Sequence, residues 1–187
     1  MKVFKVRDYI ESYYLVYNIV VANTKEDALK VIKKKSYDES YFTLEDIEEI
    51  LNMVRKTAKS RNVTVEFEDN SSECILGDRD KFYQLVLNLV ENATKYSKEK
   101  GGYVKISSYN EAGYYYLIVK DNGIGIPDED ISRIFERFYR VDKSRKKGGT
   151  GLGLAIVKHI VKIFNGEINV KSKLGEGSTF EVKIPYL

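Results

Sequence analysis

The segment Asp121-Asn-Gly-Ile-Gly-Ile-Pro127 constrains the fold of this chain more than any other feature. Taken alone, Asp-Asn-Gly most often marks a tight turn that the aspartate caps. Two further elements change that interpretation. An Asn-rich helical pattern, LVLNLVENATKYS, occupies residues 85–97, and a second glycine cluster, GGTGLGLAIV, occupies residues 148–157. Three such elements in this order indicate one composite site rather than three separate turns.

The composition indicates one domain of ordinary size with a small additional module, because the chain has 187 residues, of which 43% are hydrophobic. The net charge of +3 is small and no long block of one sign occurs, so we expect no nucleic-acid partner. Cys74 is the only cysteine, which excludes an intrachain disulfide and favours a reducing compartment.

The longest apolar run, Tyr13–Ala22, is interrupted by Asn18 and is too short to span a membrane. The first residues alternate and carry Asp8, unlike a signal peptide. We therefore expect a cytoplasmic chain without a membrane segment of its own, which is compatible with a membrane-anchored parent protein.

Residues 1–41 are predicted to form a small module of a β-hairpin, a helix and a linker. Alternating patterns around Val3–Val6 and Tyr14–Val21 indicate two strands joined by a turn at 8–12, and Thr24 opens a helix that ends in Lys33-Lys-Lys35. Strand edges and many tyrosines suggest self-association or docking through residues 1–36. A stabilising extension of the main sheet is the alternative, and the sequence does not decide between them.

Residues 42–187 are predicted to form the second domain, an α+β two-layer sandwich with a mixed sheet and helices on one face. A capping box at Thr43-Leu-Glu-Asp46 opens a helix that runs to Ser60. Further helices are expected at 80–96, 128–135 and 151–164, and strands at 63–67, 103–108, 114–120, 167–170 and 178–184.

Asn88 and Asn92 lie four residues apart, so a helix places both on one face, offset from the stripe of Leu85, Leu89 and Ala93. Asparagine is a poor residue for a helix interior, so two of them indicate a role beyond solvation. The amide oxygen of asparagine is a hard ligand suited to Mg²⁺, which keeps several waters and takes oxygens from phosphates.

The cluster Gly149-Thr-Gly-Leu-Gly153 opens the helix that follows a basic loop. Glycine amides at a helix N-terminus form an anion site. The same residues suit a flexible hinge, and the two interpretations are compatible. The loop cations Lys143, Arg145, Lys146 and Lys147 would also attract a polyphosphate.

Together these elements resemble the catalytic, ATP-binding domain of sensor histidine kinases, a branch of the Bergerat-fold ATPases that includes gyrase. The resemblance covers residues 42–187, and Ile134-Phe-Glu-Arg-Phe-Tyr-Arg140 is similar to the family's phenylalanine-rich box. It implies ATP and magnesium as cofactors and transfer of the γ-phosphoryl group to a histidine on a separate helical domain. It also implies a response regulator as a partner in two-component signalling.

The resemblance implies roles for particular residues. Asn92 is implied as the magnesium ligand, Lys95 and Tyr96 border the phosphates and the lid, and Asn88 and Arg140 are catalytic. Arg140 would reach the terminal phosphate, where a guanidinium suits planar, bidentate contacts, although the sequence does not separate it from Arg137. The implied nucleotide site is completed by the residues of the two glycine turns: Gly123, Gly125, Ile126, Gly149, Thr150, Gly151, Leu152 and Gly153.

Asp121 is expected to recognise the base. A carboxylate at the end of a strand accepts a hydrogen bond from an adenine amino group and rejects guanine, whose equivalent position is a carbonyl. Gly123 and Gly125 are expected to let the backbone approach the base without a Cβ in the way. Phe135 and Phe138 are expected to pack against the base of the lid.

Two departures from the family pattern concern the reaction. A sensor kinase carries its phosphoacceptor histidine just before the ATP-binding domain, whereas the only histidine here, His159, follows the second glycine cluster. Gyrase-like ATPases place a water-activating glutamate one turn before the magnesium asparagine, where this chain has Asn88, and Glu91 is expected to project elsewhere. We therefore expect slow hydrolysis at most and no autophosphorylation within this chain. An excised or rearranged kinase and a module that acts on a partner in trans both fit this expectation.

Two other functions share the same motifs. One is a regulator that holds ATP or ADP without phosphotransfer. The other is an adaptor in which residues 1–36 bind a partner and the nucleotide site is a conformational sensor. Because all three hypotheses require nucleotide binding, the motifs do not separate them.

Overall fold

The computed structural model describes residues 2–10, 14–22, 41–42, 44–71, 75–76, 78–141 and 149–185. The chain divides into two compact units, 1–41 and 42–187. The helix predicted at 24–35, Cys74 and the loop cations at 143–147 lie outside the described residues. Within the described ranges, no helix has the length and apolar character that crossing a bilayer requires.

The first unit contains a β-hairpin. β1 (Lys2–Ile10) pairs antiparallel with β2 (Tyr14–Ala22) over its whole length. The first strand continues through Asp8 because that residue pairs with Val16, so the predicted turn at 8–12 is too long. Among the described residues the two strands form a two-stranded sheet of their own.

The second unit is built on a five-stranded mixed sheet with the strand order β4-β6-β7-β9-β8. β4 runs parallel to β6, and the other neighbours are antiparallel. The strands are β4 (Val63–Asn70), β6 (Gly102–Glu111), β7 (Tyr114–Asp121), β8 (Glu167–Lys173) and β9 (Gly177–Pro185). A short pair, β3 (Tyr41–Phe42) and β5 (Ile75–Leu76), forms a separate two-stranded sheet.

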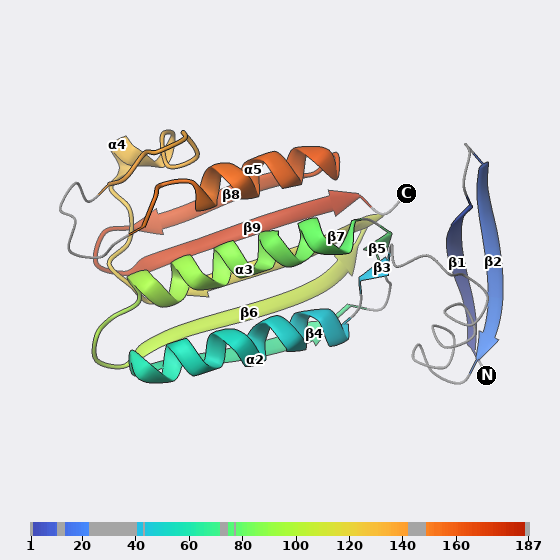
Figure 1. Ribbon diagram of the computed structural model, residues 1–187, viewed down its shortest axis with the longest axis horizontal. Helices are drawn as coiled ribbons and strands as arrows, with labels where there is room; N and C mark the ends of the chain where they lie inside the picture. Colours follow the sequence, from blue (N-terminus) through green and yellow to red (C-terminus); the bar gives the residue numbers. More distant parts are fainter. Residues whose placement is uncertain are drawn as a thin grey trace. The chain divides into compact units, whose positions relative to one another are not determined.

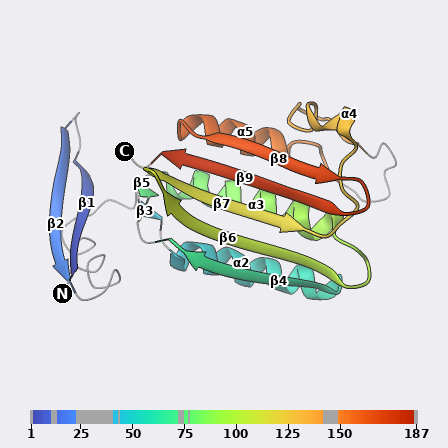
Figure 2. The same ribbon diagram turned by 180° about the vertical axis from the view of Figure 1, so that it is seen from behind.

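Three helices lie side by side on one face of this sheet, and within the described part of residues 42–187 no helix covers the other face (Figure 1, Figure 2). They are α2 (Leu44–Ser60), α3 (Arg79–Tyr96) and α5 (Gly153–Ile163). This arrangement confirms the predicted α+β sandwich with a mixed sheet and helices on one face.

α4 (Asp128–Ile131) is shorter than the helix predicted at 128–135. Its hydrogen bonds explain the difference. The Arg133 N–H donates to Asp130 O and the Glu136 N–H donates to Arg133 O, so the chain tightens into turns that span three residues.

α3 begins at Arg79 because Asp78 caps it. Asp78 Oδ1 accepts a hydrogen bond from the Lys81 N–H at 3.1 Å. The Lys81 ammonium contacts the same carboxylate, and these contacts lower the pKa of Asp78. The predicted start at Asp80 is therefore one residue too late.

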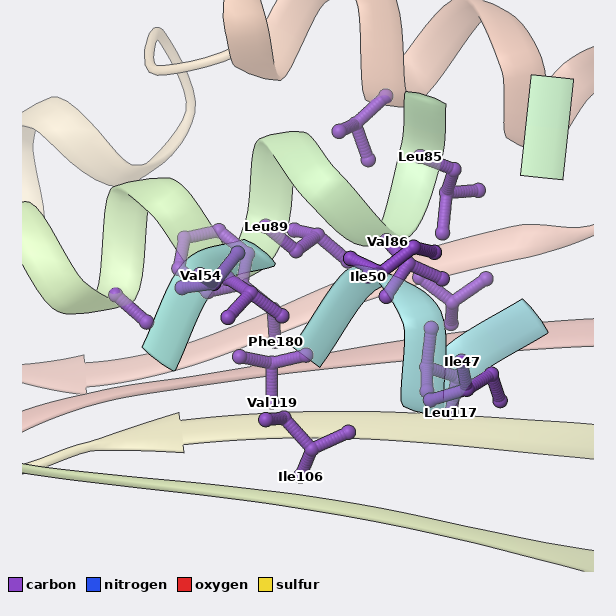
Figure 3. Close-up of a cluster of buried hydrophobic side chains, with 14 of the residues drawn as sticks. Ile47, Ile50, Val54, Leu85, Val86, Leu89, Ile106, Leu117, Val119 and Phe180 are labelled. Carbon is purple, nitrogen blue, oxygen red and sulfur yellow. The ribbon is translucent and has the colours of Figure 1, made fainter. Parts of the chain in front are cut away.

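The core lies between the helices and the covered face of the sheet (Figure 3). Apolar residues recur at helical spacing along α2 and α3, and every second residue of each strand points inward. The cluster in Figure 3 includes Ile47, Ile50, Val54, Leu85, Val86, Leu89, Ile106, Leu117, Val119 and Phe180.

Leu89 tests this packing because its side chain is 1% exposed. We expect Leu89→Ala to lower the free energy of unfolding by about 2–5 kcal/mol, since it removes buried methyl groups and leaves a cavity. Ile163→Ala, at a position of α5 that is 43% exposed, is expected to cost less than about 1 kcal/mol. Denaturant titration measures both, and equal losses would contradict the placement of α3 against the sheet.

Candidate nucleotide site

One end of the sheet carries a cavity of about 430 Å³. It is lined by residues of α3, of the turn after β7 and of the segment that opens α5, and these elements meet at the end of the sheet that carries α4 (Figure 1). Every predicted site residue except Gly123 and Leu152 lines it. The lining therefore includes Asn88, Asn92, Lys95, Tyr96, Asp121, Gly125, Ile126, Arg140, Gly149, Thr150, Gly151 and Gly153.

Asp121 ends β7 and is only 6% exposed. Its Oδ1 accepts hydrogen bonds from the Gly123 N–H at 2.8 Å and from the Ser178 N–H at 3.3 Å. Burial raises the pKa of Asp121, and the two backbone hydrogen bonds offset part of this rise. Within the described ranges no hydrogen bond ends on Oδ2, so this oxygen can accept one from a ligand in the cavity.

The glycines of the turn after β7 have a packing role that the sequence did not reveal. A Cβ on Gly123 would lie 2.1 Å from the Tyr96 carbonyl oxygen, and one on Gly125 would lie 2.0 Å from the Lys173 carbonyl oxygen. Gly125 also has a φ of +69°, which disfavours a side chain. The two glycines thus let the turn pack against the protein's own backbone.

α3 presents Asn88, Asn92 and Lys95 to the cavity. Asn88 is fixed by its own helix, because its Nδ2 donates to the Gln84 carbonyl at 2.7 Å. Glu91 also lines the cavity, so the expectation that it projects elsewhere is wrong. It lies three residues after Asn88 and four before Lys95, and a helix places residues at these spacings on one stripe.

The start of α5 faces these amides. A Cβ on Gly153 would lie 2.9 Å from Asn88 Oδ1, so the missing side chain lets α5 approach α3 closely. α5 begins after Leu152, which offers no side-chain cap. Its first N–H groups therefore lack a cap, and such groups attract anions. Gly149 lies beside the Lys95 ammonium, which adds positive charge to the same wall.

The structure separates Arg140 from Arg137. Arg140 is half-buried and lines the cavity, whereas Arg137 is exposed and is not part of the lining. The residue before Arg140 is held firmly. Tyr139 donates a hydrogen bond to Asp130, which raises the pKa of Tyr139, and the Arg133 guanidinium lies 4.3 Å from the centroid of its ring.

Phe138 does not pack as expected, because 71% of it is exposed. Its backbone is instead the fixed part: φ is +65°, and its N–H donates to the Gly151 carbonyl at 2.9 Å. A Cβ on Gly151 would lie 2.7 Å from the Phe138 carbonyl carbon, so backbone contact closes the base of the loop. Phe135 is half-buried against the core.

Besides Glu91 and Tyr139, which also line the cavity, sequence reasoning missed two polar residues that lie outside every motif. Ser178 supplies an N–H to Asp121, and Arg61, in the turn after α2, contributes to the lining. Neither residue belongs to a glycine or asparagine motif, so no local signal identifies them. His159 is exposed on α5.

Comparison with known proteins identifies the class. The sequence profile of the family described as Histidine kinase-, DNA gyrase B-, and HSP90-like ATPase matches residues 77–187. The chain therefore belongs to this family, as the motifs predicted. The sensor histidine kinase WalK of Bacillus subtilis (strain 168) is 49% identical over 113 residues, which are 58% of this chain and 18% of WalK. The chain spans about a fifth to about a third of the length of the curated relatives that it matches.

Solved structures share the fold. The catalytic domain of the histidine kinase ThkA superposes on this chain with a TM-score of 0.68 at 29% sequence identity. The superposition covers 78% of this chain and 94% of the ThkA chain. Full-length ShkA, solved in complex with AMPPNP, superposes with a TM-score of 0.69 at 27% sequence identity. The superposition covers 80% of this chain and 32% of the ShkA chain.

Asp121→Asn isolates the cost of the buried charge. It keeps Oδ1 as an acceptor for the Gly123 and Ser178 amides but removes the carboxylate. The pKa of Asp121 is higher in the folded state than the ordinary aspartate value of 3.8. We therefore expect the wild type to lose stability as the pH rises from 3.8 through the raised pKa of the folded state. Near neutral pH we expect the variant to melt at the same temperature as the wild type or higher, and this advantage to shrink as the pH falls.

Thermal unfolding followed across this pH range measures the difference between the two proteins. A variant that melts below the wild type at every pH would show that the carboxylate stabilises the fold.

Proposed function

We propose that residues 42–187 form a catalytic domain that binds Mg-ATP and transfers the γ-phosphoryl group to a histidine on a separate phosphoacceptor domain in two-component signalling. The observation that carries this proposal is that α3, the turn after β7 and the start of α5 converge on one cavity. The similarity to WalK and ThkA supports a kinase, and the AMPPNP bound to ShkA supports a nucleotide as the ligand.

Asp121 is proposed to hold the adenine. Its Oδ1 is occupied by two backbone N–H groups, so Oδ2 is the oxygen that accepts from the amino group of the base. The turn residues Gly125 and Ile126 line the cavity next to it and would flank the ring. A buried acceptor selects adenine over guanine because a carbonyl cannot donate to it.

Asn92 is proposed to hold magnesium together with the phosphates. Within the described residues no group of three or more His, Cys, Asp or Glu could bind a metal by itself. The donor set nevertheless fits magnesium, since this ion keeps waters and takes most of its oxygens from nucleotide phosphates. When bound, magnesium would neutralise charge on the phosphates. The uncapped start of α5 and Lys95 would bind the remaining phosphate oxygens.

In the proposed reaction a nitrogen of the partner's histidine forms a bond to the γ-phosphorus. The bond from this phosphorus to the bridging oxygen breaks, and ADP leaves. Arg140 would contact the terminal phosphate and stabilise its charge during the transfer. The phosphoacceptor domain and the response regulator are proposed as partners, and self-association or docking through residues 1–36 remains a hypothesis.

Calorimetric titration of the whole chain with ATP and ADP, with and without magnesium, tests the site. Asp121→Asn is expected to weaken the binding of every adenine nucleotide by at least about tenfold, because an amide NH₂ group replaces the oxygen that accepts from the base. Asn92→Ala is expected to weaken the binding of Mg-ATP by about tenfold and to leave the affinity for ADP without metal nearly unchanged.

Asn169→Ala, an exposed amide on β8, serves as the matched control and is expected to bind as the wild type does. If the wild type binds neither nucleotide, the proposed function is wrong. If Asn92→Ala weakens all nucleotides equally with or without metal, the assignment of magnesium to Asn92 fails.

Phosphotransfer is measured by mixing the chain with γ-labelled ATP and a purified histidine-bearing helical domain from a sensor kinase. We expect label on the histidine of that domain, and Arg140→Ala should slow its appearance more than about tenfold because a charged contact to the phosphate is lost. Arg137→Ala, which changes an exposed arginine outside the cavity, should transfer at the wild-type rate. Bound nucleotide without transfer to such a domain would favour a regulator that only holds nucleotide.

A further inference from the structure

Ser172 is the centre of a small polar network beneath the cavity. It lies on the inward face of β8, a face that otherwise presents the apolar residues Ile168 and Val170. Its Oγ accepts a hydrogen bond from the Ile126 N–H at 2.8 Å, lies 2.8 Å from Ser178 Oγ, and donates to the Gly177 carbonyl at 2.9 Å.

The hydroxyl of Ser172 uses its full hydrogen-bonding capacity in this arrangement. A serine hydroxyl has one proton and two lone pairs. If Ser172 donates to Gly177 O, then Ser178 Oγ–H must be the donor between the two serines. The second lone pair of Ser172 then accepts from Ile126. All partners are satisfied at once, so one side chain ties β8, the start of β9 and the turn after β7 together.

The partners of Ser172 are the two segments that flank Asp121. Ile126 belongs to the turn that follows Asp121 and lines the cavity. Ser178 supplies the N–H that binds Asp121 Oδ1 at 3.3 Å, and a Cβ on the adjacent Gly177 would lie 2.1 Å from the Asp121 carbonyl oxygen. Moving Ser172 would therefore move both walls that orient the carboxylate.

We propose that Ser172 is a positioning residue for base selection: it fixes the Ile126 and Ser178 segments so that the Asp121 carboxylate is held in one orientation toward the base. Ser172 is not part of the cavity lining, so it acts through these neighbours and not by contact with the nucleotide. This inference rests on the proposed function, because it assumes that the cavity binds an adenine nucleotide through Asp121.

The test compares the affinities of the whole chain for ADP and for IDP, whose base carries a carbonyl in place of the adenine amino group. The measured quantity is the dissociation constant for IDP divided by that for ADP, and both constants are obtained by competition. In Ser172→Ala we expect this ratio to fall by about fivefold to tenfold, because the Asp121 acceptor is no longer fixed and penalises the carbonyl less. Ser172→Thr keeps the hydroxyl and suits a strand, so it should restore the wild-type ratio.

A purely structural role for Ser172 gives a different result. Partial unfolding would weaken ADP and IDP by the same factor and leave the ratio unchanged, and that outcome overturns the proposal. Ser107→Ala, on the face of β6 that carries no helix, controls for loss of a strand hydroxyl and should leave the ratio at the wild-type value. If Ser172→Ala does not fold, Ser172→Cys decides, since it keeps the volume with much weaker hydrogen bonds.

Failure of the inference and failure of the proposed function are distinguishable. If the wild-type chain does not bind ADP, the nucleotide site itself is wrong. If the wild type binds ADP and discriminates against IDP, but Ser172→Ala discriminates equally well, only the role of Ser172 is wrong.

Discussion

The contact between the last turn of α3 and the turn after β7 is the constraint on which the site depends. The carbonyl of Tyr96 accepts the Ile124 N–H at 3.1 Å, and Gly123 lies so close to that oxygen that no side chain fits. The last carbonyls of a helix lack partners within it, so this bond also completes α3. Asn122 closes the neighbouring loop by accepting from the Tyr103 N–H and donating to the Gly101 carbonyl, both at 2.9 Å. Contacts within the protein thereby hold the asparagine face of α3 next to the carboxylate of β7.

That junction carries an energetic conflict. Asp121 is buried where its charged form is disfavoured, and among the described residues the N–H groups of Gly123 and Ser178 compensate for the lost water. We expect an uncharged residue here to suit the fold at least as well, and the proposed recognition of a ligand by the carboxylate accounts for its presence. The same reasoning applies to Ser172, a hydroxyl on an inward face that apolar residues otherwise occupy.

Hydrophobic periodicity was sufficient to predict the helices that cover the sheet, because α2 and α3 each bury one continuous stripe. The motif residues of the cavity were also predictable, since they are adjacent in the sequence within each motif. Ser178 and Arg61 were not, because they reach the cavity only through the strand order and the turn after α2. Ser172 was not predictable either, because it lies outside the lining and contacts the site only through Ile126 and Ser178. The sequence assigned the turn glycines to ligand approach, whereas their closest neighbours are backbone atoms of Tyr96 and Lys173. The exposure of Phe138 depends on a backbone contact with Gly151, which no pattern of side chains reveals.

The side chains of the cavity also indicate whether the γ-phosphoryl group would be transferred to water or to a histidine. Attack by water requires a base to remove a proton, whereas a neutral imidazole already carries the lone pair that forms the new bond. Asn88 is an amide that cannot take up a proton, and its Nδ2 is committed to Gln84. Asp121 is held by backbone N–H groups at the proposed base end of the cavity. Glu91 shares the stripe of α3 but is exposed, and within the described residues no hydrogen bond or ion pair fixes its carboxylate. Among the described residues no carboxylate is fixed as a base at the proposed phosphate site. The proposed site is therefore better suited to a nucleophile that needs no deprotonation, which favours a histidine acceptor over water.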